Sequence, residues 1–528
     1  MELQKTIVNS ILSHYSPSSA TTMSAQDLPE RYKEQIYGVL NCYDRMVFTG
    51  TLPQYCYAEG MTAILYAKKI RIFDYAKEFA EPLRDMLRER TEALAKENKI
   101  EIEFIRRIDA FRKEDRIKKI LAERGEQPGL VHIFSAMEAC TAYRPWHDKQ
   151  TGKTALKTMD GKCLHYYFYF IDSELGLCYL RVPTWSPFRL QWYCNGHSIL
   201  AGALRKAGIE FTMVDNAFFT VDNLDKANGL AERLKIDRLH RIMDNYAEQF
   251  CPVLAKLGIK PHWSIMQVEY ATDILFKRQE DLQRIYSLLV ETMIHSVKPE
   301  NIATFLGQKL RGNYQGEMGN NFNVRHEGTR IKHSMGPVSI KMYDKAKIVL
   351  RIETTVNNVT FFKQYREVRR QNGEAQTTWA TMKKTIYSLA PLRDILHASN
   401  HRYLAFLSQI DTPDAGVKQL QKITSSQTEN HHRYKGFNPL HENDAEVFRI
   451  LARGEFCIHG LTSRAVHRLL PQKTSGQIGR LLKRLRIHGL LKKVGSTYKY
   501  YLTTLGQRLV IAALKLREQF FIPQLAWG

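Results

Sequence analysis

The sequence predicts an α+β protein, in which a mixed or antiparallel sheet domain with large helical insertions precedes a small C-terminal domain. The chain has 528 residues, a length typical of two to four domains. Its centre carries alternating aromatic segments that favour strands, and long amphipathic segments that favour helices flank them. A polar stretch over residues 411–440 then separates this part from a basic C-terminal region. These three observations predict the class and the main domain boundary.

Residues 29–222 form the first predicted part, an α+β region that, for the reasons given below, we expect to bind nucleic acid. The aromatic segment 163–171 and the segment 177–182 favour strands, and the turn residues between them predict a β-hairpin. A helix at 196–208 followed by a strand gives the local order β-β-α-β, which is typical of a sheet with helices on one face. The preceding residues 1–28 are polar and rich in Ser and Thr, so we expect a flexible leader.

Residues 223–410 form the second predicted part, which combines helices with β-hairpin strands. Residues 223–310 are expected to be mostly helical, because their apolar residues recur at helical spacing. Helices resume up to about residue 410 after three strand-like segments. These segments are 323–333, 338–343 and 348–356. The change of composition at 411–440 predicts a linker.

The C-terminal region, residues 441–528, carries 15 Lys and Arg against 5 Asp and Glu, a formal charge of +10. Its pattern is helix, helix, turn, helix, β-hairpin and helix, with Pro471 and Gly476 at the turn and Gly489 after the third helix. This order resembles a winged helix-turn-helix domain of the MarR type. The resemblance implies that the third helix enters a DNA major groove and that the hairpin contacts phosphate.

The basic side chains of this region are the predicted nucleic-acid contacts, since its apolar residues occupy one face of the third helix. The contacts are Arg464, Lys473, Arg480, Lys483, Arg484, Lys492, Lys493 and Lys499. The alternative is a winged helix that contacts only protein.

A second motif lies in residues 340–354, where Tyr343 and Lys345 precede an Arg-apolar-Glu strand. It resembles the late motif of rolling-circle replication initiators of plasmids and filamentous phages, and residues 187–197 are similar to a Gly-His segment of the phage proteins. The resemblance implies that Tyr343 attacks a DNA phosphate, that Lys345 contacts phosphate, and that Glu353 helps to hold Mg²⁺ or Mn²⁺. A tyrosine with a pKa near 10 is a weak nucleophile, so such an attack needs a metal to polarise the phosphate. The alternative is a structural or phosphate-binding role, since strand alternation alone lines up these side chains.

Other basic and aromatic residues of the large region favour nucleic acid less directly. Four cations near the second motif are predicted to contact a nucleic-acid backbone, although a solvated pair of charged strands would carry the same residues. They are Arg325, Arg330, Lys332 and Lys341. Trp146, in a predicted basic loop, suits base stacking or loop packing. Asp44 and His262 could each be ligands, but an isolated polar residue of this kind more often has a structural role, and we favour that interpretation.

The composition argues against several classes of protein. A net charge of +23 favours a polyanionic partner. The sequence shows neither an apolar run that could span a bilayer nor a signal segment, so we expect no membrane partner. Eight scattered cysteines without a C-x-x-C pair are typical of a reducing cytosol and predict a cytoplasmic location. Phosphate-loop and dinucleotide motifs are missing from the sequence, so we expect no nucleotide or nicotinamide cofactor.

The chain as a whole resembles a widespread bacterial family, often linked to mobile elements, that carries no assigned activity. Three functions fit the patterns. The first is a mobile-element protein that binds and nicks DNA, similar to a replication initiator or linked to a transposon. The second is an RNA-binding effector of the guide-RNA type without its own cleavage chemistry, and the third is a non-enzymatic transcriptional regulator. DNA, RNA or both are the expected partners, and an oligomer is compatible with the sequence.

Overall fold

The computed structural model divides into two compact units, Met1–Asp411 and Thr412–Gly528. The described residues are 27–106, 112–310, 314–325, 328–369, 373–410, 413–453, 455–456, 460–495 and 497–526. Most of the predicted leader therefore lies outside the described residues. Its last residue, Leu28, is fully buried and its backbone N–H donates to Ser408 Oγ at 2.8 Å.

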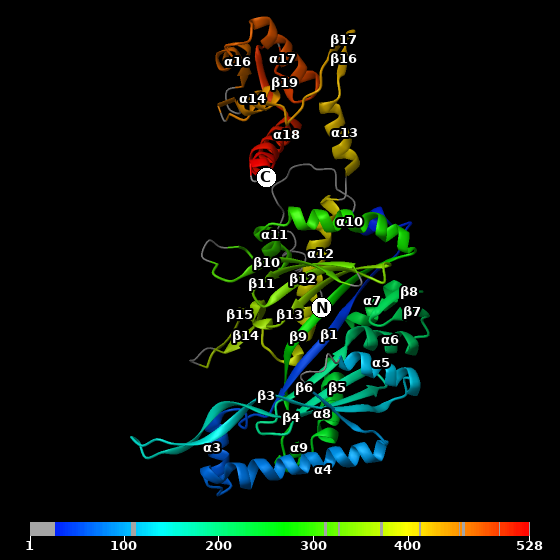
Figure 1. Ribbon diagram of the computed structural model, residues 1–528, viewed down its shortest axis with the longest axis vertical. Helices are drawn as coiled ribbons and strands as arrows, with labels where there is room; N and C mark the ends of the chain where they lie inside the picture. The colour runs from blue at the N-terminus through cyan, green and yellow to red at the C-terminus, as the bar shows by residue number, and fades with distance from the viewer. Residues whose placement is uncertain are drawn as a thin grey trace. The chain divides into compact units, whose positions relative to one another are not determined.

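An eleven-stranded sheet forms the centre of the first unit (Figure 1), with the order β10-β11-β12-β13-β9-β1-β6-β5-β4-β3-β2. Its neighbouring strands are antiparallel except for the parallel pair β2 and β3, so the sheet is mixed. The strands are β1 (Ile36–Thr51), β2 (Ile102–Ile105), β3 (Gly129–His147), β4 (Thr154–Asp172), β5 (Gly176–Pro183), β6 (Leu190–Asn195), β9 (His262–Phe276), β10 (Met318–Arg325), β11 (Gly328–Met335), β12 (Val338–Lys345) and β13 (Val349–Val356).

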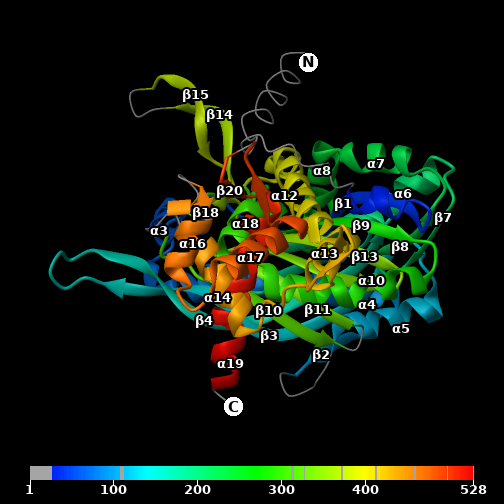
Figure 2. The same ribbon diagram turned by 90° about the horizontal axis from the view of Figure 1, so that it is seen from above.

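Helices and two small hairpins complete this unit. The helices are α2 (Leu28–Arg31), α3 (Ala58–Ala67), α4 (Glu81–Asn98), α5 (Lys113–Arg124), α6 (Gly196–Lys206), α7 (Leu224–Glu232), α8 (Ile236–Phe250), α9 (Val253–Leu257), α10 (Gln279–Ser296), α11 (Pro299–Phe305) and α12 (Leu389–Ile410). The hairpins are β7 (Phe211–Val214) with β8 (Ala217–Val221), and β14 (Lys363–Arg369) with β15 (Ala375–Thr381). The hairpin β14–β15 and the far end of the hairpin β3–β4 extend away from the rest of the unit (Figures 1 and 2).

Two layers cover the central strands β1, β9 and β13. On one face, α12 is fixed by Asn400, whose Nδ2 donates to the backbone oxygens of Tyr270 at 3.0 Å and Ile352 at 3.2 Å. On the other face, α6, α7 and β8 pack an apolar cluster that includes Leu40 and Phe218. Side chains alternate between the two faces of a strand. The polar residues of β1, β9 and β13 that point towards this apolar cluster therefore lie on the face opposite α12.

The predicted hairpin over 163–182 is confirmed, because β4 and β5 pair antiparallel with Tyr169 opposite Tyr179. The prediction that residues 223–310 are mostly helical is wrong over 262–276, which form β9 in the middle of the sheet. The segment 323–333, predicted as one strand, is divided between β10 and β11, and its residues 326–327 lie outside the described residues. Strands from both predicted parts, 29–222 and 223–410, join this single sheet.

The second unit contains helices around a three-stranded sheet of order β18-β20-β19. Its elements are α13 (Pro413–Thr424), β16 (Gln427–Glu429), β17 (His432–Tyr434), α14 (Glu442–Leu451), β18 (Leu461–Thr462), α16 (Ser463–Leu469), α17 (Ser475–Ile487), β19 (Leu491–Lys493), β20 (Lys499–Leu502), α18 (Thr504–Lys515) and α19 (Ile522–Ala526). Residues 411–440, expected as a linker, hold α13 and a short hairpin. Ile423 and Phe437 anchor this segment in the unit's own core.

Two further findings bear on the predicted environment. Among the described helices, none is both long and apolar enough to cross a membrane. The seven cysteines that the structure describes are free thiols, five of them buried.

Candidate functional site

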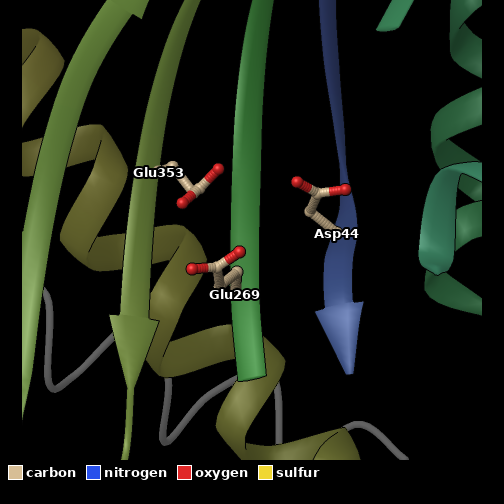
Figure 3. A group of neighbouring side chains, drawn as sticks. All are labelled: Asp44, Glu269 and Glu353. Atoms are coloured by element: carbon tan, nitrogen blue, oxygen red, sulfur yellow. The ribbon is translucent and has the colours of Figure 1, made fainter. Parts of the chain in front are cut away.

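Three carboxylates meet on the face of the sheet opposite α12 (Figure 3). Asp44 comes from β1, Glu269 from β9 and Glu353 from β13, and their carboxylate oxygens lie within 4.8 Å of one another. The pairing of β1 with β9 shifts register between Tyr43 and Met46, and Asp44 lies in this irregularity. A β-bulge changes the direction in which a side chain points. The irregularity at Asp44 therefore lets its carboxylate reach Glu269 and Glu353 on the same face of the sheet.

Arg351 is the central cation of the buried cluster. Its guanidinium binds Asp273 in a bidentate pair, with Nε to Oδ1 and Nη2 to Oδ2 both at 2.7 Å. Its Nη1 donates to Asp44 Oδ2 at 3.2 Å. All three side chains are almost completely buried. A buried arginine between two aspartates requires this hydrogen-bonded geometry, because the charges have lost their hydration.

Asp44 accepts further hydrogen bonds from the end of β6, from the start of α6 and from the β7–β8 turn. Asn195 Nδ2 donates to it at 2.7 Å and Asn216 Nδ2 at 2.8 Å. His197 Nδ1 lies 3.1 Å from Asp44 Oδ1, while its Nε2 lies 2.9 Å from Arg351 Nη2. His197 Nε2 also lies 3.3 Å from Asp273 Oδ2. Burial alone would lower the pKa of His197, but its negative neighbours, Asp44 and Asp273 among them, hold that pKa well above its usual range.

Lys341 and Tyr343, two residues apart on β12, bind the carboxylates from the other side. Lys341 Nζ donates to Glu269 Oε1 at 2.9 Å and to Glu353 Oε1 at 2.6 Å. The Tyr343 hydroxyl donates to Glu353 Oε2 at 2.5 Å. The tyrosine predicted as a nucleophile and the glutamate predicted as a metal ligand are therefore in direct contact.

The pKa values in the cluster follow from burial and from the nearest charges. Burial and the negative charge of Glu353 raise the pKa of Glu269 and that of the Tyr343 hydroxyl. Burial would raise the pKa of Asp44, but the nearby Arg351 outweighs it and holds that pKa well below its usual range. Burial alone would lower the pKa of Lys341, yet its two glutamate partners raise it.

The cluster carries more negative than positive charge. Four carboxylates, those of Asp44, Glu269, Asp273 and Glu353, contact two cations, Arg351 and Lys341. With Tyr343 neutral and His197 protonated, as its raised pKa favours, the four carboxylates still outnumber the three cations, and a divalent cation would offset the excess. The donor set fits one, since carboxylate oxygens are the ligands that Mg²⁺ and Mn²⁺ prefer. Glu269 Oε1 accepts from Lys341 and Thr355, while its Oε2 receives no hydrogen bond from the described residues.

The other basic residues predicted near this motif are distributed along β10, β11 and β12. Lys345 Nζ donates to Asn216 Oδ1 at 2.9 Å, at the edge of the cluster. Lys332 is half-buried and lies opposite Lys341 in the strand register. Arg330 is half-buried, and its Nε has no hydrogen-bond partner among the described residues. Arg325 ends β10, and its side chain lies outside the described part of the chain.

The predicted aromatic loop around Trp146 is part of strand β3. Lys157 on β4 places its Nζ 3.3 Å from the centre of the indole ring. This cation–π contact covers one face of the indole ring.

In the second unit, α16 and α17 follow each other with a short turn. Thr462 caps α16 by accepting from Ala465 N, and Thr474 and Gln477 form a capping box at the start of α17. Ile478, Leu482 and Leu485 are buried beneath α17 as the helical spacing predicted. Most of the predicted contact residues are exposed, namely Arg464, Arg480, Lys492, Lys493 and Lys499, whereas Lys473 is half-buried.

Two predicted contacts on α17 are instead held inside the unit. Arg484 donates to the backbone oxygens of Lys435 at 2.7 Å and Gly436 at 2.6 Å, and pairs with Asp444 at 3.2 Å. Its guanidinium also lies 3.7 Å from the ring centre of Phe437. Lys483 lies 3.6 Å from Glu429. Arg484 therefore ties residues 435–437 to α17, a role that helical spacing alone did not indicate.

Several residues of the buried cluster were missed or assigned another role. Glu269 and Asp273 lie on β9, in a segment predicted as helical, and for Asp44 a structural role was favoured over that of a ligand. Acidic residues inside an otherwise apolar strand are the signal that could have identified the first two, because buried charges occur only where they are paired.

The comparisons give no relative for this arrangement. Protein-family models, curated proteins and solved structures were each searched with the chain, and none of the three comparisons found a match.

Proposed function

We propose that this protein binds nucleic acid and transfers a phosphodiester of a single strand to Tyr343, with a divalent cation held by Asp44, Glu269 and Glu353. The observation that carries the proposal is the hydrogen bond from the Tyr343 hydroxyl to Glu353 beside two further carboxylates. The resemblance of residues 340–354 to rolling-circle initiators supports the same assignment.

The chain's own residues account for the proton and the substrate. The Tyr343 oxygen attacks phosphorus while its proton passes to Glu353, which already accepts that hydrogen bond. The 3′ oxygen leaves with a proton from water, and the 5′ phosphate stays on tyrosine. A bound Mg²⁺ or Mn²⁺ would offset the carboxylate charge and polarise the phosphate. Lys345, at the edge of the cluster, would contact the phosphate. A labelled single strand incubated with the protein and Mn²⁺ should therefore migrate with the protein on a denaturing gel.

Added Mn²⁺ is expected to stabilise the protein, because a cation bound only by the folded state contributes about 2.7 kcal/mol at a hundredfold excess over Kd. Glu269→Gln should abolish this stabilisation. The effect should weaken from pH 7.5 towards pH 5, since the proton that the raised pKa of Glu269 retains competes with the cation. Thermal unfolding with and without Mn²⁺ measures all three effects. An equal Mn²⁺ response in Glu269→Gln would remove this cluster as the cation site.

We propose in addition that the second unit is a winged helix-turn-helix that binds duplex DNA. Its support is the order α14, α16, α17 and the hairpin β19–β20, with exposed cations on α17 and on the hairpin. Such a domain inserts the helix after the turn into the major groove and places the hairpin on phosphate. The steep salt dependence of such binding follows from counterion release.

Arg480→Ala and Arg484→Ala are expected to act on different properties. Arg480 is exposed, so its removal should weaken duplex binding, by about 1–3 kcal/mol if it reads a base, and leave the melting temperature unchanged. Arg484 holds two backbone oxygens and Asp444, so its removal should lower the stability of the second unit. Fluorescence anisotropy with labelled duplex and thermal unfolding separate the two. The assignment fails if Arg480→Ala binds duplex as well as wild type does.

One observation favours a second candidate function, a regulator without chemistry. Lys341 already bridges Glu269 and Glu353, so the cluster contains an internal cation. In this alternative, the charges only hold the strands in register, and neither Mn²⁺ stabilisation nor a covalent adduct is expected.

A further inference from the structure

The hairpin β14–β15 presents an exposed aromatic pair that the proposed chemistry does not use. Tyr365 and Trp379 are direct cross-strand partners, and their ring centroids lie 5.9 Å apart. Tyr365 is 59% and Trp379 is 58% exposed. Large aromatic rings usually lose most of their exposure in a monomer, so a pair this open marks a binding surface.

The hairpin is built to hold the pair away from the rest of the unit. It forms a separate two-stranded sheet that extends outward (Figure 2). Buried Phe362 and Met382 anchor its base, where Met382 N donates to the Phe362 oxygen at 2.9 Å. It follows β13, the strand of Glu353, with only a short turn of helix at Val359–Phe361 between them.

Charge and register identify the occupant. The strand alternation places Lys363 and Arg369 on the same exposed face as Tyr365, with one acid, Glu367, between them. Aromatic rings flanked by cations are the way in which proteins bind single-stranded nucleic acid, since bases stack on the rings and cations contact the phosphates. A duplex hides its base faces, so the pair does not fit the ligand of the second unit.

We infer that Tyr365 and Trp379 form a stacking site for unpaired bases, so that this hairpin binds single-stranded nucleic acid. The inference rests on the proposed nucleic-acid function. It adds a contact for the single-stranded nucleic acid on the hairpin that follows β13, the strand that carries Glu353. Trp146, on the other projecting hairpin, makes no equivalent site, because the Lys157 ammonium lies over one face of its ring.

The test uses the full chain and a labelled oligothymidylate of about 20 nucleotides, longer than a typical single-strand site. Trp379→Ala should lower affinity about 5- to 150-fold, the loss that corresponds to one stacked base, and Trp379→Tyr should restore most of it. Thr378→Ala, exposed on the opposite face of the same strand, should bind as wild type does. Affinity of Trp379→Ala for duplex, which the second unit is proposed to bind, should stay unchanged.

The outcomes separate the two proposals. Wild-type affinity of Trp379→Ala for oligothymidylate would overturn the stacking site and leave the hairpin to a protein partner. An equal loss in Thr378→Ala would also overturn it, since the effect would then not belong to the rings. If the wild-type protein bound neither oligothymidylate nor duplex, the nucleic-acid function itself would be overturned.

Discussion

Tyr343→Phe is expected to abolish covalent attachment of the protein to a cleaved single strand, with a loss of at least ~10³-fold in rate. The substitution removes only the attacking oxygen, so no other side chain at the cluster can take over the step. Binding of the strand should survive, because the ring and its packing on β12 are unchanged. Denaturing electrophoresis of labelled strands from the flanks of the protein's own gene, with Mn²⁺ present, measures the adduct.

A matched control is Tyr57→Phe, which removes the hydroxyl of an exposed tyrosine in the same unit. This variant should form the adduct at the wild-type rate. Lys345→Ala should reduce the rate less than Tyr343→Phe does, since water can replace part of a phosphate contact. If Tyr343→Phe still yields the adduct, Tyr343 is a structural residue that holds Glu353.

Arg351→Leu is expected to destabilise the first unit by about 3–5 kcal/mol, because it leaves the buried Asp44 and Asp273 without the arginine that pairs with both. Urea unfolding of the full chain, followed for the first unit, measures this change. The double variant Arg351→Leu, Asp273→Leu should recover part of the loss, since it removes one unpaired buried charge together with the cation.

The pH dependence of unfolding tests whether Arg351 stabilises the unit through its charge. In the wild type, the pKa values of Asp44 and Asp273 lie below their unfolded values, because Arg351 outweighs burial. The ion pairs of Asp44 and Asp273 with Arg351 therefore contribute to the free energy of unfolding in full above about pH 4, and this contribution is lost on further acidification. The stability difference between wild type and Arg351→Leu should narrow as the pH falls below this value. A difference that stays constant from pH 7 to pH 3 would show that Arg351 acts through packing and not through charge.

Local sequence patterns predicted much of the second unit. The apolar face of the third helix, formed by Ile478, Leu482 and Leu485, and the terminal Gly489 lie where the helical periodicity placed them. These features depend on residues close in sequence, so a single chain shows them. Arg484 could not be assigned in this way, because its partners Lys435, Gly436 and Asp444 are 40 or more residues away.

Only part of the candidate site could be predicted from the sequence, because its other residues come together through long-range contacts. Tyr343 and Glu353 lie on neighbouring strands joined by a tight turn, so alternation and the motif could pair them. Asp44, Glu269 and Asp273 reach the same face through a sheet order that places β9 between β13 and β1. That order comes from long-range strand pairing, and residues 262–276 do not show a simple alternation because the second half of β9 is buried on both faces. Because this segment was predicted as helical, two of the four carboxylates of the cluster, Glu269 and Asp273, were missed.

The central claim is that the Tyr343 oxygen takes the phosphodiester, and mapping of the covalent linkage tests it most directly. The protein would be incubated with single strands and Mn²⁺, trimmed with nuclease, digested with a protease and analysed by mass spectrometry. The account predicts one peptide that contains Tyr343 and carries a nucleotide through a phosphotyrosine bond. A nucleotide on any other residue, or no modified peptide while the strand is bound, would contradict it.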